Sequence, residues 1–259
     1  MEWEKAVEQV SDALKVLPLP VWEMIVKRGA GYREMKSLAQ RYPPGVFLTL
    51  MVVVGLNDYQ LKGKAEVAYW PPLRKHLDAS HVPDSLKDLE RILEPFYQKE
   101  RLNPEKVIRL RRFLESPLAR RLWNMTPKEA AQHLKGIWQE VALVMKQKPS
   151  KKTITFAAKA LAIGLLLLNE TGFDFAGIPV PVDSRVKNLT SSLSDDRIRQ
   201  FWDETLGRLR KTEPNLTHLH LDSLLWQYGG AANKRLYLID LGIGEAAATR
   251  IEQTFAILR

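Results

Sequence analysis

Apolar residues recur every three or four positions along almost the whole chain. The clearest runs are Trp3, Val7, Val10 and Leu14, and Val107, Leu110, Phe113 and Leu114. This spacing places apolar side chains on one face of a helix. The pairs Asn-Pro at 103–104 and Thr-Pro at 126–127 are typical of a helix cap followed by proline in the first turn. Because alternating strand patterns are scarce, the sequence predicts an all-α protein of about ten helices, joined by short turns such as Gly229-Gly230.

Composition and charge narrow the class of protein. The longest mostly apolar runs, residues 46–56 and 157–168, are too short to cross a bilayer, which takes roughly 20 residues. The acidic N-terminus does not resemble a signal peptide, so we expect a cytoplasmic protein that does not bind membranes. The absence of cysteine excludes thiol catalysis, disulfides and iron–sulfur clusters. A net charge of +9 indicates a phosphate-binding surface, although a generally basic soluble protein fits the charge equally well.

Residues 134–168 form two helical stretches separated by a polar, basic break at 146–150, which predicts a helix-hairpin-helix. Ser150 can cap the second helix, and Lys151 and Lys152 then fall in its first turn. Cations are unfavourable at that end of a helix. The same surroundings, however, favour a free amine on Lys152, and a free amine can attack a sugar C1′.

Two readings of this lysine-rich break stay open at this point. In one, Lys148, Ser150 and Lys151 contact DNA phosphates and the break carries no chemistry. In the other, Lys152 is a nucleophile. Phe156 and Lys159 follow it by four and seven positions and share its helix face, where a ring and a second cation would suit a nucleobase. Packing of Phe156 in the core is the alternative.

A proline-rich approach to the next helix begins at Gly177 and ends at Asp183. Its two prolines, Pro179 and Pro181, hold the backbone extended, and Asp183 can cap the helix that follows. A carboxylate fixed at a helix start can also point into a cleft, so Asp183 is either a plain cap or a cap with a catalytic role.

Four stretches together resemble a known family. They are residues 58–64 with Trp70, residues 152–156 with Lys159, residues 178–183 with Arg185-Val186, and residues 219–226. A lysine at the head of the second hairpin helix, followed by an apolar helix and Val-Pro-Val-Asp, resembles the helix-hairpin-helix DNA glycosylases. The complete set is similar to the archaeal 8-oxoguanine DNA glycosylases, abbreviated AGOG.

The resemblance implies a role for each of these residues. Lys152 would be the nucleophile and Asp183 the catalytic carboxylate. Rings of Phe156 and Trp226 would sandwich the extruded base. The residues implied to contact the same base are Lys159, Asp222, Trp70 and Gln60. From spacing alone, Asp222 and Trp226 share one helix face, which would place a hydrogen-bond acceptor beside a flat ring.

The implied activity is that of a bifunctional glycosylase and AP lyase. It would excise 8-oxoguanine from double- or single-stranded DNA through a lysine Schiff base and β-elimination, without metal or cofactor. His218 and His220 lie two residues apart and lack an evident third metal ligand. Two alternatives remain: a glycosylase for a different damaged base, because Gly31 stands where the family tends to have glutamine, or a non-catalytic helix-hairpin-helix DNA-binding protein.

The resemblance also implies the domain organisation. Residues 1–60 and 184–259 would form one helical domain, and residues 61–183 the other, with the helix-hairpin-helix at about 134–168 and the base pocket between the two. We expect a monomer. Two arginine-rich stretches, 109–112 and 120–121, could follow the DNA backbone, although a solvated helix face explains them equally well.

Overall fold

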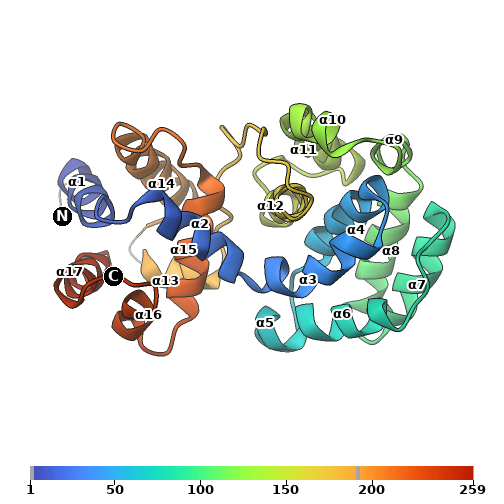
Figure 1. The fold of residues 1–259 in the computed structure, drawn as a ribbon, viewed down its shortest axis with the longest axis horizontal. Coiled ribbons are helices and arrows are strands. Elements are labelled where there is room, and N and C mark those ends of the chain that lie inside the picture. Colours follow the sequence, from blue (N-terminus) through green and yellow to red (C-terminus); the bar gives the residue numbers. More distant parts are fainter. Residues whose placement is uncertain (1–2, 191–192, 259) are drawn as a thin grey trace. The chain divides into compact units, whose positions relative to one another are not determined.

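The computed structural model describes residues 3–190 and 193–258, and within these ranges it has seventeen α-helices and no strand (Figure 1). The predicted all-α class is confirmed. The helices outnumber the ten expected because many are short and begin at a proline, as α9 (Pro117–Trp123) and α10 (Pro127–Gln132) do. Within the described residues, no helix is long and apolar enough to cross a membrane.

The chain divides into two compact units, residues 1–29 with 176–259 and residues 30–175. The first unit contains α1 (Trp3–Leu14), α2 (Leu19–Arg28), α13 (Ser184–Leu189), α14 (Asp195–Leu209), α15 (His218–Gly230), α16 (Lys234–Asp240) and α17 (Glu245–Ala256). The second contains α3 (Ala30–Arg41), α4 (Pro44–Asn57), α5 (Ala65–Ala68), α6 (Trp70–Asp78), α7 (Leu86–Gln98), α8 (Asn103–Leu114), α9, α10, α11 (Leu134–Val144) and α12 (Lys152–Leu167).

The boundary between the units differs from the one expected from the resemblance. Residues 30–60 were expected with the terminal parts of the chain, but α3 and α4 pack against α12 and lie in the second unit. Residues 176–183 were expected in the second unit and lie in the first. The division falls at Gly29, which ends α2 with an extended backbone. The reason is that α4 is apolar on all sides, and a helix of this kind must be surrounded by other elements.

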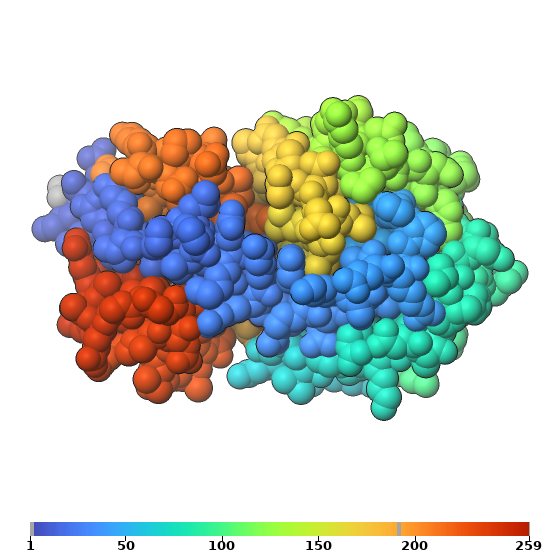
Figure 2. Space-filling model, viewed as in Figure 1, coloured from blue at the N-terminus to red at the C-terminus, as the bar shows by residue number. Residues whose placement is uncertain are grey.

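Helices α4 and α12 form the centre of the second unit, where α3, α10 and α11 also contact α12 (Figure 1). Two glycines bring the pair close together. A Cβ atom at Gly55 would lie 2.7 Å from the carbonyl oxygen of Phe156, and one at Gly164 would lie 2.9 Å from Cγ of Met51. These distances are too short for any side chain, so the position of α12 depends on both glycines. Figure 2 shows the yellow α12 segment beside the blue segment of α3 and α4.

The turn between α11 and α12 has a defined geometry although it lacks glycine. Lys146 adopts a left-handed conformation with φ 53°. The N–H of Gln147 donates to the carbonyl of Ala142 at 2.9 Å, and the N–H of Lys146 donates to that of Leu143 at 3.0 Å. This is the Schellman pattern of helix termination, which usually has glycine at the left-handed position. The hairpin predicted at 134–168 is therefore present, with lysine in place of that glycine.

The start of α12 differs from the prediction by one residue. Ser150 does not cap the helix, because the N-cap is Lys151, with extended dihedrals of φ −64° and ψ 132°. The carbonyl of Lys151 accepts the N–H groups of Ile154 at 2.9 Å and Thr155 at 3.0 Å. Lys152 is consequently the first helical residue, with its side chain at the positive end of α12.

Candidate active site

Lys152 lies in the second unit, on a face of α12 that is partly open to solvent. Its side chain is half-buried, whereas that of Lys151 is exposed. The Nζ atom of Lys152 lies 5.4 Å from the centroid of the Phe156 ring, which is a cation–π distance when the amine is protonated. The structure therefore brings together the predicted nucleophile and one of the predicted stacking rings.

The two sides of α12 differ in how far they are buried. Phe156 and Lys159 are each half-buried, while Ile154 and Ala157 are buried in the core. Phe156 is not among the fully buried residues, so part of its ring is accessible to solvent. Lys152, Phe156 and Lys159 share the partly exposed face, as their spacing predicts.

Trp70, the first residue of α6, is buried and has only 6% of its surface exposed. Its ring packs edge-on against Tyr69, with centroids 5.4 Å apart. It also lies against Gly31 of α3, where a Cβ atom would be 3.3 Å from Cζ2 of Trp70. Gly31 therefore leaves room for this ring, and a larger residue there would press on it.

Gln60 is exposed, in a loop between α4 and α5, and adopts a left-handed conformation with φ 47°. The neighbouring Tyr59 holds this loop against α8. The ring centroid of Tyr59 lies 5.3 Å from Nζ of Lys106 and 5.2 Å from Cζ of Arg109. Burial lowers the pKa of both cations. Sequence reasoning missed Lys106, which is completely buried and 3.8 Å from a carboxylate oxygen of Glu100.

The turn before α12 presents the residues predicted to contact phosphate. Lys148 and Lys151 are exposed and Ser150 is half-buried. The turn is tied to α11, because Nε1 of Trp138 donates to the carbonyl of Pro149 at 3.1 Å. A rigid, basic turn of this kind can bind a phosphate group with its side chains.

Asp183 lies in the first unit, where it caps α13 as its position predicts. Its Oδ1 atom accepts the N–H groups of Arg185 and Val186, each at 2.9 Å. The residue is 8% exposed. Since both N–H groups donate to Oδ1, Oδ2 has no part in capping the helix. The cap fixes the carboxylate and does not compete with a chemical role.

Asp222 and Trp226 lie one turn apart on α15 of the same unit, as their spacing predicts. Asp222 is buried, with 3% of its surface exposed, whereas Trp226 is half-buried. The guanidinium of Arg185 lies over the Trp226 ring, with Cζ 4.0 Å from the ring centroid. The first unit thus holds the Asp183 carboxylate fixed by the start of α13, and Arg185 of the same helix stacks on the half-buried Trp226 ring.

Comparison with known proteins identifies the family of this chain. The sequence model of AGOG, described as N-glycosylase/DNA lyase, matches residues 11–254. The chain belongs to the AGOG family. The matched range includes all four stretches that resemble the family. The chain is accordingly an N-glycosylase/DNA lyase, an enzyme of DNA repair.

Archaeal relatives carry the same description. The N-glycosylase/DNA lyase of Methanopyrus kandleri is 28% identical over 75% of this chain and 78% of its own length. That of Pyrobaculum aerophilum is 24% identical over 89% of each chain. The crystal structure of the 8-oxoguanine DNA glycosylase from Pyrobaculum aerophilum, complexed with 8-oxoguanosine, has the same fold, with a TM-score of 0.74 at 18% identity over 96% of each chain.

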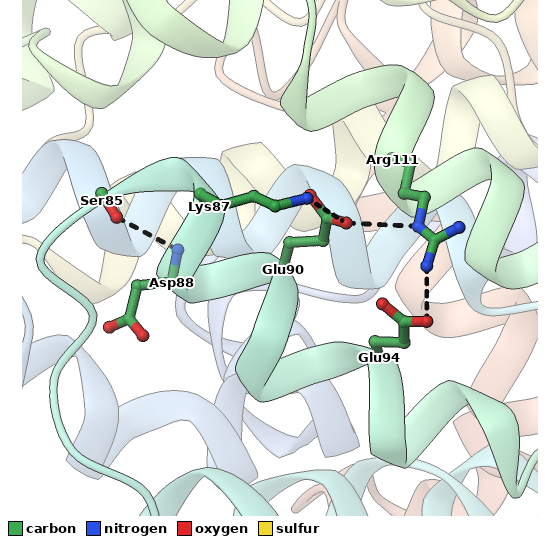
Figure 3. A network of polar contacts seen from close by, with 6 residues as sticks. All are labelled: Ser85, Lys87, Asp88, Glu90, Glu94 and Arg111. Carbon is green, nitrogen blue, oxygen red and sulfur yellow. Dashed lines mark hydrogen bonds and ion pairs between the residues drawn. The ribbon is translucent and has the colours of Figure 1, made fainter.

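The arginine-rich segment 109–112 of this AGOG member mostly serves its own fold. Arg109 is buried, and its Nη2 atom donates to the carbonyl of Leu56 at 3.1 Å. Arg111 pairs with Glu90 at 3.2 Å and with Glu94 at 2.6 Å, in a network that joins α7 and α8 (Figure 3). Arg109 is therefore enclosed by its own unit, whereas Arg111 is exposed and paired with two glutamates of α7.

The two histidines at the start of α15 have structural partners. Nε2 of His218 lies 2.6 Å from Oδ1 of Asp203. His220 completes a capping box in which its Nδ1 accepts the N–H of Thr217 at 3.2 Å. Burial lowers the pKa of His220 to about 4, so the ring is neutral at pH 7 and able to accept this bond.

The His220 cap makes stability fall on acidification. A histidine whose pKa lies below its unfolded value of about 6.5 stabilises the fold fully above that pH and loses this contribution as pH falls toward 4. The loss is expected to be about 2 kcal/mol between pH 7 and pH 4.5. Urea unfolding at pH 7 and pH 4.5 measures it. A His220→Gln variant, whose glutamine can form the same box without titrating, should lose less stability on acidification. Equal losses in both proteins would contradict this role.

Proposed function

We propose that the chain excises 8-oxoguanine from double- or single-stranded DNA and then cleaves the strand. The observation that carries this proposal is Lys152, a half-buried amine at the first residue of α12 with the Phe156 ring 5.4 Å away. The description of a relative's crystal structure as an 8-oxoguanine DNA glycosylase supports the choice of lesion.

In the proposed reaction, the damaged nucleotide is rotated out of the duplex and its base stacks on Phe156 and Trp226. Polar contacts to the base would come from Lys159 and Asp222, with Trp70 and Gln60 as further contacts. The exposed turn residues Lys148, Ser150 and Lys151 would hold the phosphates. Stacking is sequence-tolerant, so the polar contacts would select the lesion.

The chemistry follows from a free amine and a carboxylate. The Nζ lone pair of Lys152 forms a bond to C1′ as the glycosidic C1′–N9 bond breaks. The base leaves with the electron pair of the C1′–N9 bond and takes up a proton. Opening of the sugar ring gives a Schiff base. Loss of a proton from C2′ then expels the 3′ phosphate, and water releases the enzyme. Asp183 would accept a proton from the Lys152 ammonium group and stabilise positive charge on the sugar.

A panel of lesion-containing DNA tests this proposal. The chain should release base from 8-oxoguanine in duplex and single strands in the presence of a metal chelator, and borohydride should trap it covalently on the DNA. Undamaged guanine is the control. Release of another damaged base in preference to 8-oxoguanine would replace the substrate and keep the chemistry. DNA binding without cleavage would indicate a non-catalytic protein.

A further inference from the structure

Arg185 connects the proposed catalytic carboxylate with the proposed stacking ring. Its backbone N–H donates to Oδ1 of Asp183 at 2.9 Å. Its guanidinium lies over the Trp226 ring, with Cζ 4.0 Å from the centroid, and Nη1 donates to the carbonyl of Trp226 at 3.2 Å. One residue of α13 therefore contacts two proposed site residues through different groups.

Two glycines at the end of α15 make room for this arginine. A Cβ atom at Gly229 would lie 3.0 Å from Cβ of Arg185, and one at Gly230 would lie 2.6 Å from its Cζ. Both glycines are helical, where glycine is the least favourable residue after proline. The close approach of Arg185 explains why this helix ends in a pair of glycines.

The stacked arginine has two consequences for Trp226. It covers one face of the ring, so a base can stack only on the other face. It also draws electron density from the covered face by the cation–π attraction, which favours contact of the other face with an electron-rich purine. Because the guanidinium is held at both Trp226 and the glycine pair, the plane of the ring is fixed before a base arrives.

We propose that Arg185 is a positioning residue that fixes Trp226 as the stacking wall for the damaged base and thereby sets the efficiency of base excision. This inference rests on the proposed function. It makes a specific distinction, because base excision needs the base to be held, whereas cleavage at a preformed abasic site involves no base. Arg185 therefore serves the first reaction and not the second.

The test compares Arg185→Ala with the matched variant Arg197→Ala. Cζ of Arg197 also lies 4.0 Å from a tryptophan ring, that of Trp3, in the same unit and outside the proposed site. Single-turnover rates are measured for base release from 8-oxoguanine DNA and for strand cleavage of DNA with a preformed abasic site. Arg185→Ala should lower base release roughly tenfold or more and leave abasic-site cleavage within about twofold. Arg197→Ala should change neither rate.

A second pair of variants keeps Arg185, and one of them displaces its guanidinium. Gly230→Ala retains Arg185 but occupies the space of its guanidinium, and should show the same selective loss of base release. Gly207→Ala is the matched control, because a Cβ atom there meets nothing within 4 Å. Arg185→Lys should not restore base release, since an ammonium group lacks the flat surface that stacks on the ring.

The outcomes separate this inference from the proposed function. If the unsubstituted chain releases 8-oxoguanine and Arg185→Ala does so at the same rate, the inference is overturned and the proposed function stands. Equal loss of both reactions in Arg185→Ala would also overturn it, because that result indicates a structural role. If the unsubstituted chain releases no 8-oxoguanine, the proposed function fails and the inference fails with it.

Discussion

Replacement of Lys152 by glutamine is expected to abolish base release, strand cleavage and borohydride trapping together. Glutamine has a similar length and helix propensity but no nucleophilic amine, so the fold should persist while the Schiff base cannot form. The loss in single-turnover rate should be at least about a thousandfold, as expected when a nucleophile is removed. Gel electrophoresis of borohydride-treated complexes measures the trapped fraction directly.

Lys151→Gln is the matched control for this experiment. Lys151 is the exposed N-cap residue directly before Lys152, so both variants remove one positive charge from the same end of α12. Lys151→Gln should still be trapped, and should bind DNA more weakly with a smaller dependence on salt. Trapping that persists in Lys152→Gln and disappears in Lys151→Gln would assign the nucleophile to Lys151.

Replacement of Asp183 by asparagine is expected to lower base release by about a hundred- to ten-thousandfold without destabilising the protein. Asparagine caps a helix about as well as aspartate, so its side-chain oxygen can accept the N–H groups of Arg185 and Val186 as Oδ1 does. Only the negative charge and the proton acceptor are removed. Single-turnover kinetics and thermal unfolding of the same preparation measure the two properties separately.

Asp183→Ala provides the comparison for the cap. This variant should lose the activity and, in addition, about 1 kcal/mol of stability, because the N-terminus of α13 is then left without a side-chain acceptor. If Asp183→Asn retained full activity while Asp183→Ala lost it, the residue would be a cap only. The catalytic carboxylate would then have to be sought elsewhere.

Local sequence signals predicted the hairpin and the caps at Thr126 and Asp183, whereas α8 is capped by Leu102 and not by the expected Asn103. The break at 146–150, the helix that follows it and the cap at Asp183 each depend on a few neighbouring residues, and each is present. The assignment of the N-cap to Ser150 was wrong by one residue, since the cap is Lys151, which lacks a capping side chain. Side-chain preference for caps is only about 1 kcal/mol, and the surrounding backbone hydrogen bonds outweighed it here.

Features that depend on contacts distant in sequence could not be predicted. Gly229-Gly230 was expected to form a turn, but both residues complete α15, and Arg185, more than forty positions earlier, lies against them. The burial of Arg109 and Lys106 was equally hidden, since arginine and lysine are usually at the surface. Arg185 belonged to one of the stretches that resemble the family, but its contact with the glycine pair gave no local signal.

The roles of the base-contacting residues came from the family resemblance rather than from the residues alone. The membership in the AGOG family confirms that resemblance. The individual roles of Gln60, Trp70, Lys159 and Asp222 stay predictions. Their types and spacing permit a purine contact, but the same residues occur on ordinary helix surfaces and in ordinary cores.

The close approach of α4 and α12 limits how this enzyme can be re-engineered. Because Gly55 and Gly164 leave no room between the two helices, almost any substitution at either glycine would shift the helix that begins at Lys152. A library aimed at a different lesion should therefore keep both glycines constant and randomise the loop around Gln60 and the half-buried positions next to Trp226 on α15. Most members of such a library would retain the nucleophile in place, and screening could then report on base recognition alone.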